Sequence, residues 1–142
     1  MLLDTHVWIW AVDGGAKLGP KTRRRLSMPS SGRTRHAGPA LISTASIFEV
    51  AALHTAGRLR FTQQVERWIR ESVDRGGLRV VEIDRDVALD AGMIPASALA
   101  DPIDRCLVAT AREHQVPLVT ADRRILGYAR STGLLRVIDA SQ

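Results

Sequence analysis

The feature that most restricts the fold of this sequence is the regular alternation of short apolar stretches with longer amphipathic ones. The apolar stretches have the length of buried strands, and capping residues or glycines bound the amphipathic stretches, as they bound helices. Strands that alternate with helices favour a parallel sheet covered on both faces. We therefore predict an α/β fold with three α/β/α layers and a central, mainly parallel sheet.

The predicted strands and helices follow one another along the whole chain. Strands are expected over residues 2–7, 40–42, 78–83, 116–120 and 134–138, the first leading into a Trp-rich turn or helix. Helices are expected over residues 18–28, from a cap at Ser43 or Thr44 to Gly57, and over residues 62–74, 84–92, 101–114 and 122–130. Residues 29–39 are rich in Pro, Ser, Gly and Arg and are expected to form an exposed loop.

The length and the apolar runs favour one soluble domain. A chain of 142 residues can bury a core of its own, so we predict a single domain over residues 1–142. No apolar run approaches the roughly 20 residues of a membrane span, and the first residues lack the basic leader of a signal peptide. The single cysteine, Cys106, has no partner within the chain, which favours a reducing cytoplasm.

The chain is basic, with a net charge of +5, and only Lys17 and Lys21 among its cations are lysines. Arginine suits bidentate contacts with phosphate, so a polyanionic partner is one interpretation. A general bias of the source genome toward arginine explains the same composition, so the charge alone does not decide.

Four acidic residues fall near the predicted carboxyl ends of strands, where ligands bind in parallel α/β sheets. Asp4 follows the apolar Leu2-Leu3, and Asp122 follows the strand in VPLVTAD. Glu49 lies in the second turn of the helix after the strand 40–42, and Asp104 lies in the first turn of the helix that Asp101 begins. We expect these side chains to converge.

Each acid also has a possible structural role. Asp101, followed by Pro102, makes a good helix start, so capping is favoured over a metal role for Asp101. Capping explains Asp104 less well, and for Asp122 capping and function are equally plausible. Asp4 and Glu49 lie in apolar segments without a basic neighbour, and we expect both to be buried and functional.

Several carboxylates in one site repel one another unless a cation joins them. Oxygen ligands suit Mg²⁺ or Mn²⁺, whereas zinc is disfavoured because the histidines, at positions 6, 36, 54 and 114, are scattered. The sequence has no GxxxxGK[ST], GxGxxG or G-x-S-x-G motif, which disfavours nucleotide-driven and serine-nucleophile chemistry.

Four stretches in this order resemble the PIN-domain nucleases, specifically the VapC-type toxins of type II toxin–antitoxin systems. They are LLDTHVWIWAV, ISTASIFEVAALHTAGRL, DPIDRCLVATA and VPLVTADRRI, and they cover most of the chain. The resemblance implies that Asp4, Glu49 and Asp104 form a core acidic triad. It implies that Asp122 is the fourth, more variable acid, and that Asp101 matches an acid found in only part of the family.

The resemblance further implies an endoribonuclease dependent on Mg²⁺ or Mn²⁺, inhibited by a VapB-like antitoxin and forming a homodimer. Cleavage of RNA would leave a 5′-phosphate, with Asp104 or Asp122 helping to position or deprotonate the attacking water. Thr5 and Thr120 fall where hydroxyls can orient ligands or water. Three arginines lie beside the acids and either guide the phosphate backbone or cover a solvated helix face: Arg105, Arg123 and Arg124.

Two other functions stay open at this stage. A receiver-like signalling domain also gathers aspartates and Mg²⁺ at strand ends, but no lysine follows Lys21 in this chain. A noncatalytic nucleic-acid-binding module accounts for the charge and leaves Glu49 unexplained.

Overall fold

A five-stranded parallel sheet runs through the middle of the computed structural model, which describes residues 1–27 and 39–142. The strand order is β3-β2-β1-β4-β5. The strands are β1 (Leu2–Leu3), β2 (Leu41–Ser43), β3 (Arg79–Val81), β4 (Leu118–Thr120) and β5 (Val137–Asp139). The first strand is central: Leu2 pairs with Leu41 on one side and with Leu118 on the other.

Seven helices accompany the sheet in the described residues. They are α1 (Thr5–Val12), α2 (Pro20–Ser27), α3 (Thr44–Thr55), α4 (Val65–Gly76), α5 (Arg85–Met93), α6 (Pro102–Glu113) and α7 (Arg123–Thr132). The prediction of a strand over residues 2–7 is wrong beyond Leu3, because the Asp4 side chain accepts a hydrogen bond from the His6 N–H and begins α1. The loop predicted over residues 29–39 lies outside the described residues except for Pro39, which is exposed.

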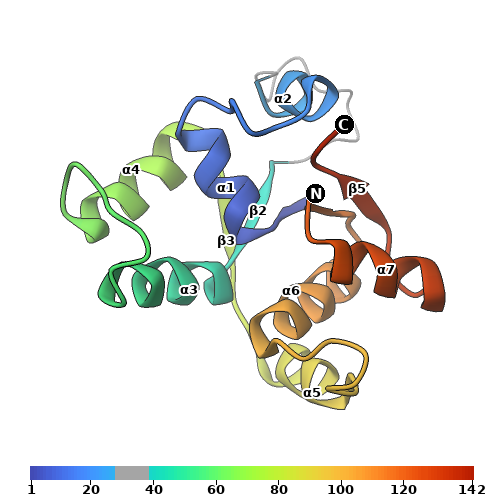
Figure 1. Ribbon diagram of the computed structural model, residues 1–142. Coiled ribbons are helices and arrows are strands. Elements are labelled where there is room, and N and C mark those ends of the chain that lie inside the picture. Colours follow the sequence, from blue (N-terminus) through green and yellow to red (C-terminus); the bar gives the residue numbers. More distant parts are fainter. Residues whose placement is uncertain (28–38) are drawn as a thin grey trace.

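Successive residues of each central strand face opposite sides of the sheet, as the two-residue period of a strand requires. Leu2, Leu41 and Leu118 belong to one core, which α6 and α7 cover. Leu3, Ile42 and Val119 belong to a second core, which includes residues of α1 and α4. Figure 1 shows α5, α6 and α7 on one side of the sheet and α1, α2 and α4 on the other. The three-layer prediction is confirmed.

Aromatic side chains concentrate in the second core. The rings of Trp8 and Trp68 lie 5.1 Å apart between centroids, and Phe61 lies 4.7 Å from Trp68. Trp8 is fully buried and Trp68 is 7% exposed, so core packing accounts for both. In the described part of the chain, no helix is long and apolar enough to cross a membrane.

Three helices begin where central strands end: α1 after β1, α3 after β2 and α7 after β4. Because these strands are parallel neighbours, their carboxyl ends share one edge of the sheet. The N-termini of the three helices therefore meet at that edge, where backbone N–H groups favour negative charge.

Candidate metal centre

Asp4 lies at the junction of β1 and α1, and both of its carboxylate oxygens are used. Oδ1 accepts the His6 N–H at 3.3 Å, and Oδ2 accepts the Thr120 hydroxyl at 2.5 Å. The side chain is buried, and this burial raises its pKa above the ordinary value although the hydrogen bonds oppose the rise. A carboxylate in an apolar segment is costly to bury without hydrogen-bond partners, and here each oxygen of Asp4 accepts one hydrogen bond.

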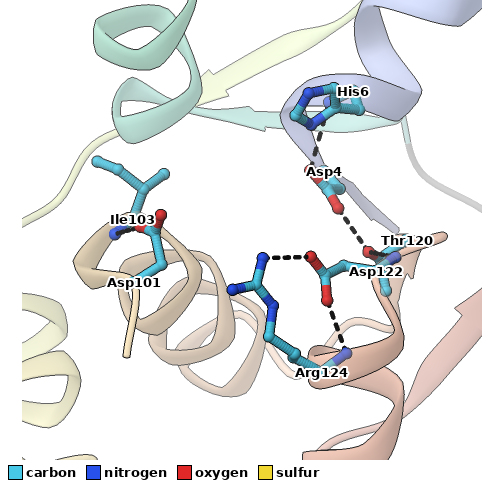
Figure 2. Close-up of polar contacts among 7 residues, drawn as sticks. All are labelled: Asp4, His6, Asp101, Ile103, Thr120, Asp122 and Arg124. Carbon is cyan, nitrogen blue, oxygen red and sulfur yellow. Dashed lines mark hydrogen bonds and ion pairs between the residues drawn. The ribbon is translucent and has the colours of Figure 1, made fainter. Parts of the chain in front are cut away.

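Thr120, the last residue of β4, links two of the acids. Its Oγ1 donates to Asp4 and accepts the Asp122 N–H at 3.0 Å. Figure 2 shows this chain of contacts from Asp4 through Thr120 to the turn that carries Asp122. Thr120 is fully buried, so the two junctions are held in a fixed relation.

Asp122 begins α7 and also binds a cation. Its Oδ1 caps the helix by accepting the Arg124 N–H at 2.6 Å, and its Oδ2 pairs with the Arg124 guanidinium at 3.3 Å. Partial burial pushes the pKa of Asp122 upward, but the contacts with Arg124 outweigh it, and the pKa lies below its ordinary value. Asp122 therefore does cap a helix, and one of its oxygens still faces the site.

Asp101 and Asp104 come from the start of α6. Asp101 caps this helix, because its Oδ1 accepts the Ile103 N–H at 2.7 Å. Asp104 makes no hydrogen bond within the described residues. Burial, followed by the charges of Asp101, Asp122 and Asp4, raises the pKa of Asp104 to about 7. The structure thus brings four acids from three separate segments of the chain into electrostatic contact, and Asp104 is the one without a hydrogen bond among the described residues.

Glu49 lies in the middle of α3 and is only half-buried. The expectation that it is buried is wrong, because α3 turns Ala45, Ser46 and Val50 inward and leaves its neighbour Phe48 65% exposed. The place of Glu49 in the acidic triad stays a prediction.

Two hydroxyls near the same edge lack partners. Thr5 Oγ1 and Ser46 Oγ, in the first turns of α1 and α3, are buried without a hydrogen-bond partner among the described residues. Orphaned buried hydroxyls in a polar site are suited to hold water or a ligand. Ser46 was missed in the sequence, where its position three residues before Glu49 was the available signal.

The donor set fits a hard divalent cation that keeps part of its water shell. Within the described residues, no three Asp, Glu, His or Cys side chains are arranged to hold an ion together directly. Mg²⁺ commonly binds through one or two carboxylates and several waters, which suits acids that are near one another without touching. The charges of Asp101, Asp122 and Asp4 contribute to the raised pKa of Asp104, after burial, and a cation among these acids would offset their repulsion.

The three arginines beside the acids differ in position. Arg124 pairs with Asp122, whereas Arg123 is exposed and makes no hydrogen bond or ion pair in the described part of the chain. Arg105 is half-buried, with its Nε unpartnered among the described residues. Arg124 is thus the arginine that the structure brings to the acids.

Comparisons of the sequence with known proteins found a family model and a relative. The family model of the PIN domain matches residues 1–131. Ribonuclease VapC22 of Mycobacterium tuberculosis (strain ATCC 25618 / H37Rv) is 35% identical over 125 residues, which are 88% of this chain and 88% of that relative.

Solved structures share the fold at low sequence identity. VapBC2 from Rickettsia felis, bound to a DNA fragment from the promoter, matches with a TM-score of 0.67 and 12% identity over 97% of this chain and 96% of that chain. A toxin–antitoxin complex from Klebsiella pneumoniae matches with a TM-score of 0.61 and 16% identity over 98% of this chain and 96% of that chain. These likenesses confirm the three-layer architecture.

Proposed function

Because the chain belongs to the PIN-domain family, we propose that it is a divalent-metal-dependent endoribonuclease that hydrolyses RNA phosphodiester bonds. The relative that is 35% identical is a ribonuclease. The observation that carries the proposal is the meeting of Asp4, Asp104 and Asp122 at the carboxyl edge of the sheet.

The receiver-like alternative is wrong. Receiver domains have the flavodoxin-like strand order, in which the first strand neighbours the second and the third. Here β1 lies between β2 and β4. The family match over residues 1–131 excludes the same alternative independently.

The proposed ligands of a Mg²⁺ or Mn²⁺ ion are Asp4, Glu49, Asp104 and Asp122, with Asp101 as a further acid whose first task is to cap α6. Thr120 fixes the Asp4 carboxylate, and the rigid start of α7 fixes Asp122. Glu49 belongs to this set by its position in the family motif. Its helix α3 packs against α1 and α6, which carry the neighbouring acids.

When bound, the cation supplies charge stabilisation to the scissile phosphate and makes a nearby water more acidic. Asp104 contributes a carboxylate with both oxygens free among the described residues, suited to hold that water or to accept its proton. The buried hydroxyls of Thr5 and Ser46 are suited to orient water at the floor of the site. Attack in line with the leaving oxygen leaves a 5′-phosphate and a 3′-hydroxyl.

The proposed partners are a VapB-like antitoxin, which would cover the acids, and a second copy of this chain. The fold neighbours include VapBC2 and a toxin–antitoxin complex. Phe48 on α3 is a large apolar side chain that is exposed in the structure, so a partner could cover it. We place the protein in the cytoplasm, where RNA and a reducing environment for Cys106 are found.

The deciding experiment is incubation of purified protein with RNA in Mn²⁺ or in a chelator, with Asp4→Asn as the control variant. We expect cleavage only for the unaltered protein in Mn²⁺, with a phosphate at the new 5′ ends. Binding of RNA without cleavage under both conditions would instead identify a noncatalytic nucleic-acid-binding module. Co-expression with a cognate antitoxin should suppress both cleavage and toxicity to the host cell.

A further inference from the structure

Arg124 occupies an oxygen that the proposed metal ion needs. Asp122 Oδ1 is committed to the cap of α7, because it accepts the Arg124 N–H at 2.6 Å. Only Oδ2 is left to face the site, and the guanidinium of the same arginine lies 3.3 Å from it. The residue that completes the helix cap therefore also blocks the remaining oxygen.

A divalent cation on Oδ2 and the guanidinium would repel each other. At a separation of about 4 Å, like charges near a protein surface interact by several times the thermal energy. Figure 2 shows the guanidinium on the side of Asp122 that faces Asp101, the residue that caps α6. The charges of Asp104 and Asp101 also act on Arg124, so its guanidinium interacts with more than one acid of the cluster.

The ion pair is weak enough to exchange. The Arg124 side chain is 69% exposed and that of Asp122 is 28% exposed. Exposed ion pairs contribute little to stability, so a competing cation can separate them without disturbing the fold. The backbone N–H of Arg124 stays on Oδ1 when the guanidinium moves, so α7 keeps its cap.

We propose that Arg124 is the internal counter-ion of the acidic cluster, that a divalent cation displaces its guanidinium from Asp122, and that the freed guanidinium then pairs with the RNA phosphate. This inference rests on the proposed function. It gives the site an order of events, because the arginine is available to substrate only after the cation is bound. Arginine suits this role because its planar group binds carboxylate and phosphate alike.

The first test is titration of the protein with Mn²⁺ by calorimetry in the absence of RNA. Arg124→Gln should bind Mn²⁺ about two- to tenfold more tightly than the unaltered protein, since the competing cation is gone. Arg123→Gln is the matched control, because it removes the same charge from the same turn without touching Asp122. It should change the affinity by less than about twofold.

The second test measures binding of a short RNA whose phosphorothioate linkages resist hydrolysis, with Mn²⁺ and with chelator. Arg124→Gln should weaken RNA binding about three- to tenfold in Mn²⁺ and by little in chelator, where Asp122 holds the arginine. Arg123→Gln should have the same effect under both conditions. Arg124→Lys keeps the positive charge but lacks the planar guanidinium that makes bidentate contacts. It should therefore restore only part of the affinity for RNA.

The outcomes separate this inference from the proposed function. If the unaltered protein binds Mn²⁺ but Arg124→Gln binds it equally or more weakly, the displacement is overturned and the metal site stands. An equal loss of RNA affinity with and without Mn²⁺ also overturns it, because Arg124 is then a simple surface cation. Failure of the unaltered protein to bind Mn²⁺ overturns the metal site and the displacement together.

Discussion

The two edges of the sheet carry opposite charges and hold them differently. At the carboxyl edge, each capping aspartate accepts a backbone N–H at the start of a helix, as Asp4, Asp101 and Asp122 do. At the amino edge, a hollow of about 520 Å³ is lined by four basic side chains and, among the described residues, by no acid. These side chains are Arg25, Arg79, His114 and Arg136.

The geometry of parallel strands explains the difference. Helix N-termini gather at the carboxyl edge and favour acids, whereas helix C-termini gather at the opposite edge and favour bases. Capping fixes the acids in place, while Arg25 and Arg79 are exposed and unpaired within the described structure. Acids that are held in place can position a reacting group, whereas exposed and unpaired arginines attract a polyanion without positioning it.

Neutralising one acid is the strongest test of the difference between the two edges. Asp4→Asn should lower the rate of RNA cleavage in Mn²⁺ by about a hundredfold or more, because Asp4 is a proposed ligand of the metal ion. Asparagine can still cap α1, so the fold should be unchanged in circular dichroism. Arg79→Gln at the opposite edge serves as control and should stay within about threefold. Equal losses in both variants would remove the distinction between the edges.

Glu49→Gln tests the acid that the structure leaves apart from the others. We expect the cleavage rate to fall by about tenfold or more, with an unchanged melting temperature because Glu49 is only half-buried. Glu66→Gln removes an exposed acid from a different helix, α4, and should leave the rate unaltered. A fully active Glu49→Gln variant would restrict the site to the aspartates.

Thr120→Val tests whether positioning matters at the carboxyl edge. Valine has the shape of threonine but cannot donate to Asp4 or accept from Asp122. Affinity for Mn²⁺, measured by calorimetry, should fall about ten- to a hundredfold. Thr120→Ser keeps the hydroxyl and should recover most of the affinity. If valine binds Mn²⁺ as well as threonine does, the acids need no such support.

The acidic edge should make the metal-free protein less stable as pH rises. The pKa of Asp104 is about 7 in the folded protein against 3.8 ordinarily, so the stability that its proton contributes is fully present below pH 3.8 and is lost as the pH rises to about 7. The raised pKa of Asp4 acts in the same direction. Allowing for solvent screening of a half-exposed group, we expect about 1–2 kcal/mol, or about 3–6 °C in melting temperature.

Thermal melts in chelator between about pH 5 and pH 8 would measure this loss. Asp104→Asn should flatten the dependence and melt higher than the unaltered protein at the upper pH. Added Mn²⁺ should reverse the trend, since it binds the ionised carboxylates. A melting temperature that rises with pH in chelator would contradict the electrostatic crowding of the four acids.

The smallest effect concerns the basic edge. Replacing Arg79 and Arg136 together with Gln should weaken RNA binding by about twofold and lower its salt dependence slightly. Cleavage of bound RNA in a single turnover should be unchanged, because neither residue is near the acids. A loss comparable to that of Asp4→Asn would show that both edges act on one RNA.

The sequence predicted the layers and the helix starts because these depend on local patterns. The cap at Asp101 was predicted from the Asp-Pro pair, and the three layers were predicted from the alternation of apolar and amphipathic stretches. The burial of Glu49 was predicted wrongly, because an apolar composition does not say which side of α3 has a partner surface. The neighbours of Asp104 and the contact of Thr120 with Asp4 depend on strand order, which no local pattern contains.

The contact between Thr120 and Asp4 joins residues 116 positions apart. During synthesis, Asp4 leaves the ribosome long before the hydroxyl that holds it has been made. In a nascent chain, the candidate site therefore stays incomplete until β4 has emerged and paired beside β1.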